Sequence, residues 1–433
     1  MKETVAERRY AWVVVGLLWV VALLNYMDRQ MLSTMKGAMK IDIAELEKAE
    51  NFGRLMAVFL WVYGLMSPLA GIIGDRLNRK WLIVGSLFVW SGVTFAMGYT
   101  SDYDVLYGLR ALMGFSEALY IPAGLSLIAD YHQGSTRSLA VGIHMTGLYM
   151  GQALGGFGAT VAAYLSWQRT FHFFGIAGII YSVVLILLLR EYKYRENAHK
   201  PVNPDPGSGE VTGASKQKSV RAVTGIRSVA SGLTLLFGMG SFWMILFYFA
   251  VPSIPGWAVK NWIPTLFSSS LGIEMPVAGP MSTITIAASS LVGVIFGGIL
   301  SDRWILRNLR GRIFTGAIGL SLTIPSLLLI GFGHSYLWII GGAVLFGIGY
   351  GMFDANNMPI LCQFVAPRLR ASGYGLMNMV GVFAGALITR VLGRSMDSGN
   401  LARDMALLAI PVLVAVVLQL VVLKPVSSNK LSD

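Results

Sequence analysis

The sequence predicts an all-α integral membrane protein with twelve transmembrane helices in two six-helix halves. Of its 433 residues, 55% are hydrophobic and only 13% are charged, and this balance excludes a soluble domain covered by a polar surface. Apolar runs of about 20 residues, the length at which a helix crosses the hydrocarbon core, recur along nearly the whole chain. An internal repeat relates the first half of the chain to the second.

The apolar runs define the expected helices in order. The predicted spans are 11–33, 52–73, 81–99, 103–129, 138–165, 170–190, 231–266, 279–300, 313–332, 336–361, 371–395 and 402–423. Arg8 and Arg9 precede the first span and no small-residue cleavage site follows it, so we expect a retained helix and not a signal peptide. The 50 glycines suit helices that pack closely inside a bilayer.

Basic residues indicate the orientation. Most of the 34 Lys and Arg residues lie in the two termini and in the loops that follow even-numbered spans. Because positively charged short loops stay cytoplasmic, we expect a multi-pass protein of the cell (inner) membrane with both termini in the cytoplasm. Topology therefore accounts for the net charge of +12, and no basic domain studded with aromatic residues indicates a nucleic-acid partner. The single cysteine, Cys362, permits no intramolecular disulfide.

The chain divides after the sixth span. Residues 191–230 are charged and contain Pro, Gly and Ser, so we expect a cytoplasmic linker there. It separates an N-terminal six-helix bundle, residues 1–190, from a C-terminal six-helix bundle, residues 231–433.

Two short sequence repeats, here called echoes, relate these halves. The first is a shared Gly-x-x-small-Asp-Arg core, formed by Gly71, Asp75 and Arg76 in one half and by Gly298, Asp302 and Arg303 in the other. The second pairs residues 136–142 with 369–375 at a slightly larger offset. Parallel six-helix halves that rock around a site at mid-membrane are the build of alternating-access carriers.

The loop after the second span carries a family resemblance. Residues 71–80 read Gly-Ile-Ile-Gly-Asp-Arg-Leu-Asn-Arg-Lys, which resembles the signature loop of the major facilitator superfamily and departs from it at Asn78, where a Gly is usual. The resemblance covers the whole chain and implies the major facilitator fold. It also implies a conformational latch made of Gly71, Asp75, Arg76, Arg79, Asp302 and Arg303. The alternative is that these charges only anchor the topology.

Within that superfamily, two motifs resemble the anion:cation symporters, which include proton-coupled carriers of sugar acids and relatives of sialin. The motifs are Asn-Tyr-Met-Asp-Arg at 25–29 in the first span, and Arg110 with Glu117 in the fourth. The stretch at 261–267, Asn-Trp-Ile-Pro-Thr-Leu-Phe, is also similar to that group. Spinster-type lysolipid carriers share the acid–Arg pair and the fourth-helix Arg and Glu, so they are the second resemblance.

Charged residues at membrane depth are the candidate site. A charge there costs about 2.5–3.5 kcal/mol on insertion scales, so such residues usually pair and face a functional space. We single out Asp28, Arg29, Arg110, Glu117 and Asp354. Arg110 and Glu117 lie within about 20° of one helix face, whereas Asp28 and Arg29 are about 100° apart around theirs. The alternatives are that Asp28 and Arg29 snorkel to the interface and that Arg110 and Glu117 form a structural buried pair.

Polar residues complete the candidate site. Carried across by the offset of the second echo, Arg110 and Glu117 fall on Ala343 and Tyr350, so we expect ion coupling to be concentrated in the N-terminal half. The remaining candidates for hydroxyl recognition or a polar cavity wall are Tyr26, Tyr63, His144, Gln152, Asp354, Asn356, Asn357 and Asn378. Hydrogen bonds between helices are the alternative role for each amide, and simple packing for the histidine.

The resemblance and these residues predict a proton-coupled secondary transporter of a small organic anion, a sugar acid or related carboxylate. Arg29 and Arg110 would hold the carboxylate, and Asp28 and Glu117 would carry protons. We expect no cofactor, no metal, and a monomer in the lipid bilayer. The alternative is a spinster-like lysophospholipid carrier. An enzyme is not expected, because the sequence holds neither a His-Glu-x-x-His motif nor a Gly-x4-Gly-Lys-Ser/Thr loop.

Overall fold

The computed structural model describes residues 5–132, 136–192, 234–365 and 369–423, apart from the side chains at 5–7, 71, 72, 74–76, 138 and 371. The predicted linker, 191–230, lies almost wholly outside the described residues. Helices make up nearly all of the described chain.

The first half of the chain begins with the long helix α1 and ends with α8. Its elements are α1 (Val5–Met39), the 3₁₀ turn η1 (Ala44–Glu47), α2 (Ala49–Arg76), α3 (Arg79–Met97), α4 (Tyr103–Glu117), α5 (Tyr120–Tyr131), α6 (Arg137–Gly155), α7 (Gly158–Leu165) and α8 (Trp167–Leu188). The second half contains α10 (Gly240–Leu271), α11 (Met275–Ile305), α12 (Gly311–Phe332), α13 (Tyr336–Asp354), α14 (Asn357–Phe364), α15 (Arg370–Asp397), α16 (Leu401–Leu407) and α17 (Ala409–Val422).

Among the described residues, eleven helical segments are long and apolar enough to cross a membrane, and the predicted all-α membrane fold is confirmed. The predicted span missing from that set, 138–165, is also helical, but it forms α6 and then α7. Polar side chains such as His144 and Gln152 interrupt its apolar character.

Four predicted spans each contain one or two residues outside the regular helix. Three of them, Tyr103–Tyr131, Tyr336–Phe364 and Leu401–Val422, are nevertheless long and apolar enough to cross a membrane as one segment. The breaks fall at 118–119, 156–157, 355–356 and 408. At the second break α11 packs closely against the chain, since a Cβ at Gly156 would overlap the Thr283 hydroxyl. Hydropathy does not report such contacts, because they depend on a helix far away in the sequence.

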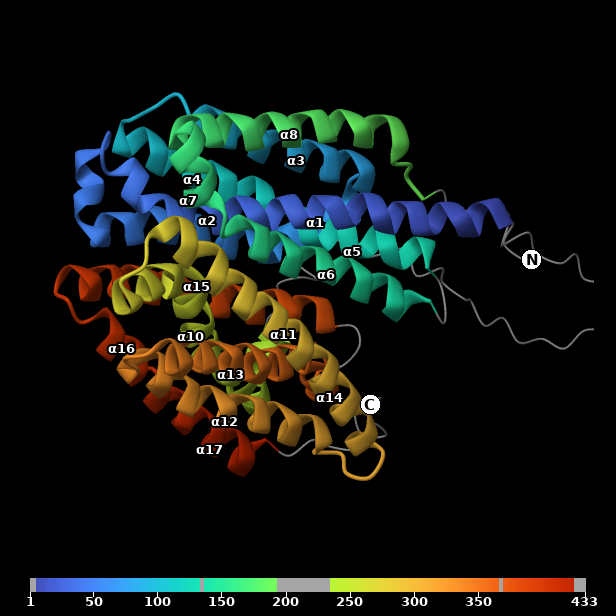
Figure 1. The fold of residues 1–433 in the computed structure, drawn as a ribbon. Coiled ribbons are helices and arrows are strands. Elements are labelled where there is room, and N and C mark those ends of the chain that lie inside the picture. The colour runs from blue at the N-terminus through green and yellow to red at the C-terminus, as the bar shows by residue number, and fades with distance from the viewer. Residues whose placement is uncertain (1–4, 133–135, 193–233, 366–368, 424–433) are drawn as a thin grey trace, which may run out of the picture.

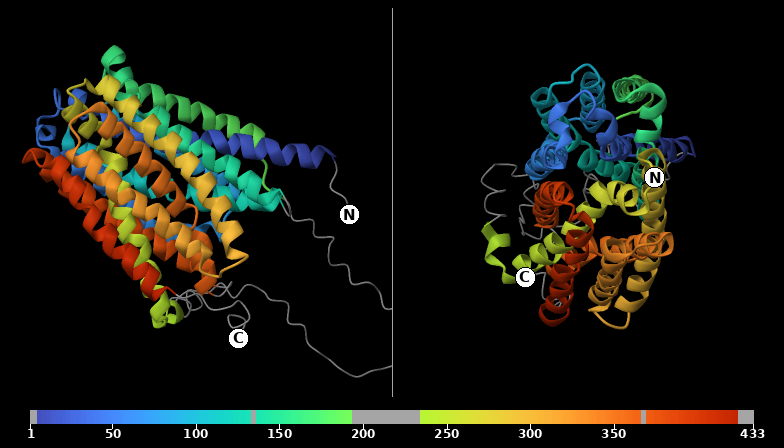
Figure 2. Two further views of the ribbon diagram at one scale, coloured as in Figure 1. Left: turned by 60° about the horizontal axis from the view of Figure 1, so that its bottom comes forward. Right: turned by 60° about the vertical axis from the view of Figure 1, so that its left-hand side comes forward.

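The helices of the two halves converge at the end that carries η1 and diverge toward the end that carries the N-terminus (Figures 1 and 2). Along α2 and α15 the halves meet closely: a Cβ at Gly53 would lie 2.8 Å from the Thr389 carbonyl oxygen, and the Asn378 amide donates to the Ser67 hydroxyl at 3.0 Å. The hydroxyl of Thr283 on α11 donates to the Ala153 carbonyl of α6 at 3.0 Å.

Four residues close the converging end, and we name them the η1-end clasp: Glu50, Arg390, Arg394 and Asp397. The Asp397 carboxylate accepts hydrogen bonds from the backbone N–H groups of Ala49, at 2.6 Å, and Glu50, at 2.8 Å. These groups belong to the first turn of α2, where helix N–H groups lack intrahelical partners. The Glu50 carboxylate in turn pairs with Arg390 at 3.1 Å and Arg394 at 2.8 Å.

The latch predicted from the signature loop lies at the opposite end of the bundle. The hydroxyl of Thr160 on α7 donates to the Pro276 carbonyl at 2.6 Å, so α11, like α2, starts near the η1 end and runs away from it. The side chains of Gly71, Asp75 and Arg76 lie outside the described residues.

The described latch candidates contact their own halves. Arg79 forms an ion pair with Asp130 of α5, Asp302 lies 3.8 Å from Arg312, and Arg303 is exposed. The latch between halves therefore stays a prediction.

Replacing Glu50 by Gln removes the ion pairs that join α2 to Arg390 and Arg394. We expect the converging end to open more often, but only by a modest factor, because these groups are partly exposed and water weakens their attraction. Thiol labelling of Ala49→Cys in a Cys362→Ser background measures this, because Ala49 is fully buried at the junction.

Glu47→Gln is the matched control. It removes a pair with Lys40, 3.7 Å away, that stays within the first half. An unchanged labelling rate in Glu50→Gln, or an equal rise in both variants, would contradict a closing role for the clasp.

Candidate functional site

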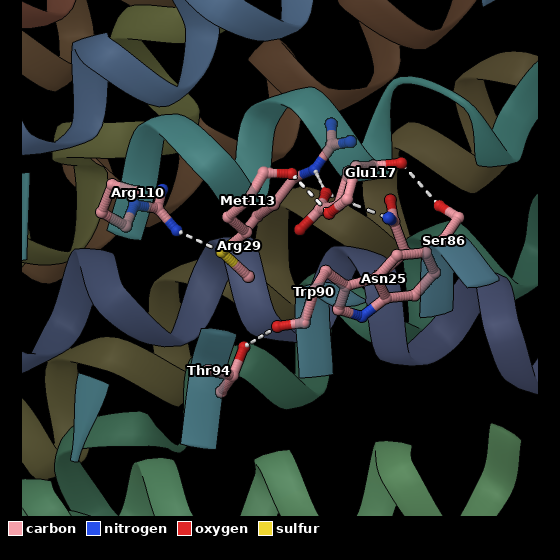
Figure 3. Close-up of polar contacts among 9 residues, drawn as sticks. Asn25, Arg29, Ser86, Trp90, Thr94, Arg110, Met113 and Glu117 are labelled. Atoms are coloured by element: carbon pink, nitrogen blue, oxygen red, sulfur yellow. Dashed lines mark hydrogen bonds and ion pairs between the residues drawn. The ribbon is translucent and has the colours of Figure 1, made fainter. Parts of the chain in front are cut away.

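A buried ion pair joins α1 to α4. Arg29 Nε lies 2.6 Å from Glu117 Oε2, and Asn25 Nδ2 donates to the same oxygen at 3.0 Å (Figure 3). Asn25 and Arg29 are four residues apart, one turn of helix, so both reach α4 from one face of α1. The Glu117 side chain is fully buried, and burial removes the water that would otherwise weaken the attraction.

Aromatic rings surround the Arg29 guanidinium. Its carbon lies 5.1 Å from the centre of the Tyr26 ring, 4.8 Å from Phe59 and 4.5 Å from Tyr63. Phe59 and Tyr63 are one turn apart on α2 and their rings stack at 5.8 Å. Ring faces attract a cation without neutralising it, so α2 holds the guanidinium in place while its charge stays available.

The second arginine approaches the same rings from α4. The Arg110 guanidinium lies 4.7 Å from the Phe59 ring centre, and Nη1 donates to the Met113 sulfur at 3.0 Å (Figure 3). Arg110 is buried, with 3% of its surface exposed. Arg110 and Glu117 are thus on one side of α4, and Phe59 is shared by two guanidinium groups.

Asp28 takes a different direction from its neighbour Arg29. Its carboxyl is in electrostatic contact with Trp90 and Thr94 on α3, and it also lies within range of Glu117 and Arg110. Only 4% of the residue is exposed. The rotation of about 100° between successive helix residues accounts for this split. Arg29 therefore pairs with α4, whereas Asp28 lies beside α3 and still interacts with the charges of α4.

The cluster keeps unused hydrogen-bonding capacity. Buried atoms without a protein partner include Arg29 Nη2, Arg110 Nε, Glu117 Oε1, Asn25 Oδ1 and Asp28 Oδ1. Buried polar groups are normally satisfied, and exceptions concentrate where a protein binds or reacts. These donors and acceptors can receive a ligand or a proton.

Three candidates of the second half gather at the break between α13 and α14. Asn357 Nδ2 donates to Asp354 Oδ1 at 3.1 Å, and Asn356 Nδ2 donates to the Met352 carbonyl at 2.8 Å. Asp354 is exposed, yet it is within electrostatic range of Tyr26 on α1 and Tyr149 on α6. Its carboxylate therefore faces the space between the halves.

The other candidates lie apart from the ion pair. His144 is fully buried on α6, with Nε2 3.1 Å from the Tyr120 hydroxyl, which donates to the Leu18 carbonyl at 2.8 Å. This is the packed histidine that the sequence left open as an alternative. Gln152 is buried on α6. Asn378 contributes its bond to Ser67 at the seam between α2 and α15.

Lys260 is the residue that the sequence-based prediction missed. It lies on α10 within the predicted span 231–266, and its backbone carbonyl accepts a hydrogen bond from Gln30 Nε2 at 2.9 Å. Its ammonium lies over the Trp257 and Tyr350 rings, at 5.2 and 5.8 Å from their centres. The sequence feature that could have revealed Lys260 is a single charge inside the apolar stretch 256–267. Asn25 and Phe59 also enter the site without having been singled out for a role.

The helical halves and their buried charges define a membrane transporter. Residues 18–389 match the family model of the Major Facilitator Superfamily, and the chain belongs to that family. No group of three or more His, Cys, Asp or Glu residues in the described part of the chain could hold a metal ion.

The chain is similar to sugar-acid transporters and to spinster proteins, among other relatives. The chain is 25% identical over 417 residues to the probable galactarate/D-glucarate transporter GudP of Escherichia coli (strain K12), covering 90% of this chain and 88% of the relative. It is also 25% identical over 402 residues to protein spinster homolog 3 of Danio rerio, covering 88% and 75%. The crystal structure of a bacterial homolog of the human lysosomal transporter Spinster superposes with a TM-score of 0.73, at 19% identity, over 95% of this chain and 96% of that one.

Gly114 sets the distance between α4 and α2. A Cβ at this position would lie 2.5 Å from the Phe59 carbonyl oxygen and 3.2 Å from the Tyr63 backbone nitrogen. Because both atoms are backbone, Gly114→Ala has to separate the helices, and we expect a loss of about 1–3 kcal/mol of stability. The melting temperature in detergent measures it.

Gly108→Ala is the control on the same helix, since a Cβ there meets nothing within 4 Å. We expect a melting temperature equal to or slightly above that of the unmodified protein, because Ala favours the helix. Equal melting temperatures for the two variants would show that α4 tolerates displacement from α2.

Proposed function

We propose that the protein is a proton-coupled symporter of a small organic anion, a sugar acid or related carboxylate. The buried pair of Arg29 and Glu117 is the observation that carries the proposal. An arginine is always charged and binds a carboxylate through two parallel hydrogen bonds. A buried carboxylate can exchange its cationic partner for a proton.

The coupling follows from competition for Arg29. When a substrate carboxylate binds the guanidinium, Glu117 loses its counter-ion inside a space that disfavours an unpaired charge. Glu117 then takes up a proton, and the loaded carrier can change conformation without an isolated buried charge. Loss of the proton restores the ion pair and expels the substrate. Arg29 Nη2 and Arg110 Nε, which lack protein partners, supply donors for the anion.

The remaining residues have supporting roles. Asp28 is the second proton-carrying candidate, because it is buried and within electrostatic range of both Arg110 and Glu117. Tyr26 and Tyr63 border the anion site. Gln152, Asn357 and Asn378 offer amides to hydroxyl groups, and Asn356 and His144 are further polar groups of the bundle.

The proposed cycle alternates access between the two ends of the bundle. Convergence of the halves at the η1 end and divergence at the other end correspond to one of its states (Figure 1). From the charge distribution of the loops we infer that the diverging end, with both chain termini, faces the cytoplasm and that the protein lies in the cell (inner) membrane. We propose a monomer that uses protons as the coupling ion and needs no other cofactor.

A lysophospholipid carrier is the second candidate, favoured by the similarity to spinster homolog 3. A lipid phosphate can also bind Arg29 and Arg110. Uptake of labelled D-glucarate or D-galactonate into proteoliposomes, beside binding of lysophosphatidylcholine to the purified protein, separates the two. Lysolipid binding without sugar-acid uptake would replace the anion symporter by the lipid carrier.

Glu117→Gln and Asp28→Asn test the proton step. Each keeps the size of the side chain and cannot release a proton. We expect at least a tenfold loss of accumulation driven by a pH gradient, with exchange of labelled for unlabelled substrate preserved, because exchange needs no net proton movement. Wild-type accumulation by both variants would refute the coupling.

Arg29→Lys and Arg110→Lys test the anion site. Lysine keeps the charge and loses the planar fork, so we expect substrate binding to weaken by about 1.5–3 kcal/mol if a charge-assisted hydrogen bond is lost. Arg54→Lys, at an exposed position of α2, is the control. Unchanged affinity in one of the two site variants would assign the anion to the other arginine, and unchanged affinity in both would remove it from this site.

A further inference from the structure

The helix breaks reveal a closer equivalence between the halves than the sequence echoes do. α4 ends at Glu117 and α5 resumes at Tyr120, whereas α13 ends at Asp354 and α14 resumes at Asn357. In both halves the last residue before a two-residue break is a carboxylate. The next helices, α6 and α15, begin at Arg137 and Arg370, the residues paired by the second echo.

This equivalence corrects the expectation that the second half lacks a counterpart of Glu117. The offset of the second echo places Glu117 on Tyr350. That offset does not apply to residues that precede the helix breaks, such as Glu117. α14 has 8 residues where α5 has 12, so the shorter helix shifts the register between the two points. The structural counterpart of Glu117 is Asp354.

A cation also recurs at the equivalent helix. Arg29 lies on α1, the first helix of its half, and Lys260 lies on α10, the first long helix of the other. Lys260 and Asp354 are close enough to attract each other, although they do not form a contact pair like that of Arg29 and Glu117, which lie 2.6 Å apart. Each half therefore presents one cation from its first helix and one carboxylate from a helix end.

We propose that Lys260 and Asp354 form a second anion-and-proton site, and that the substrate is a small dicarboxylate held between Arg29 and Lys260. This inference rests on the proposed function and specifies the charge of the substrate. The chemical class is a dianion with two terminal carboxylates, such as a sugar diacid.

The position of Lys260 suits this role. Gln30, the residue after Arg29, donates to the Lys260 backbone carbonyl at 2.9 Å, so the two cations arise from adjoining points of α1 and α10. Within the described residues, no carboxylate pairs with the Lys260 ammonium within 4.0 Å. The ammonium is held by ring faces, which leaves its three N–H donors free for an anion.

The position of Asp354 suits the exchange of a proton. Asp354 is exposed, and its carboxylate accepts a hydrogen bond from Asn357 Nδ2 at 3.1 Å. Asn357 itself is 4% exposed, and its Oδ1 has no partner. A ligand hydroxyl near Lys260 can donate to that oxygen.

Charge conservation sets the coupling ratio. When a substrate carboxylate binds Arg29 or Lys260, the nearby protein carboxylate, Glu117 or Asp354, loses the attraction of that cation and takes up one proton. A dicarboxylate occupies both cations and brings two protons, so the loaded carrier moves no net charge. A monocarboxylate binds only one of the two cations, Arg29 or Lys260, and brings one proton.

Binding by the purified protein tests the second anion site. We expect the wild type to bind D-glucarate, a dicarboxylate, at least tenfold more tightly than D-galactonate, a monocarboxylate. Lys260→Gln should weaken D-glucarate binding at least tenfold and leave D-galactonate within twofold. Lys48→Gln, at an exposed position, controls for the lost charge.

Transport by Asp354→Asn tests the second proton. Wild-type D-glucarate uptake into proteoliposomes should not respond to a potassium-diffusion potential. The Asp354→Asn variant should bring one proton with a dianion, so an inside-negative potential should slow its uptake severalfold. Uptake by Asp354→Asn that ignores the potential would overturn the second proton site.

These outcomes separate the inference from the function on which it rests. Tighter binding of D-galactonate than of D-glucarate by the wild type, or an equal loss of both ligands in Lys260→Gln, would overturn the dicarboxylate site and leave the anion symporter standing. Binding of neither sugar acid by the wild type would instead refute the proposed function.

Discussion

An ion pair removed from water is the constraint around which this molecule is organised. The burial of Arg29 and Glu117 is tolerated only while the two charges are paired, since either charge alone would be strongly unfavourable inside the bundle. The surrounding structure maintains that condition. Asn25 adds a donor to the carboxylate, Phe59 and Tyr63 hold the guanidinium, and Gly114 lets α4 come close enough to α2. If another group displaces one member of the pair, the charge of the other member has to be neutralised. A proton bound to Glu117 can neutralise the carboxylate.

Much of the architecture could be predicted from the sequence, because crossing a membrane demands a length and an apolarity that the residues display directly. The division into halves is likewise visible in the echo of Asp75 at Asp302. The angular argument about helix faces needed only the helical pitch, and it is why Asp28 and Arg29 were expected on different sides of α1.

What the sequence did not reveal depends on contacts between distant segments. α11 packs closely against the break at Gly156, and α14 has 8 residues where α5 has 12, so the register between the halves changes along these helices. The offset between residues 136–142 and 369–375 therefore does not give the counterpart of Glu117, which lies before the break between α4 and α5. Lys260 was overlooked for a related reason: in the linear sequence it is one charge in an apolar run, and its significance appears only when Gln30, Trp257 and Tyr350 are seen around it.

The η1-end clasp joins a side chain of one half to the main chain of the other. Asp397 binds the first peptide groups of α2, so part of the closure depends on helix polarity and not on any side chain of α2. When this end opens, those peptide groups and the carboxylate meet water instead of hydrocarbon, and their lost partners are replaced at once. Opening of the η1-end clasp thus exchanges protein hydrogen bonds for nearly equivalent hydrogen bonds to water. Separation of the buried charges has no such replacement. In the proposed cycle, opening of the converging end and binding of the substrate depend on separate regions, so a substitution in one region need not change the other.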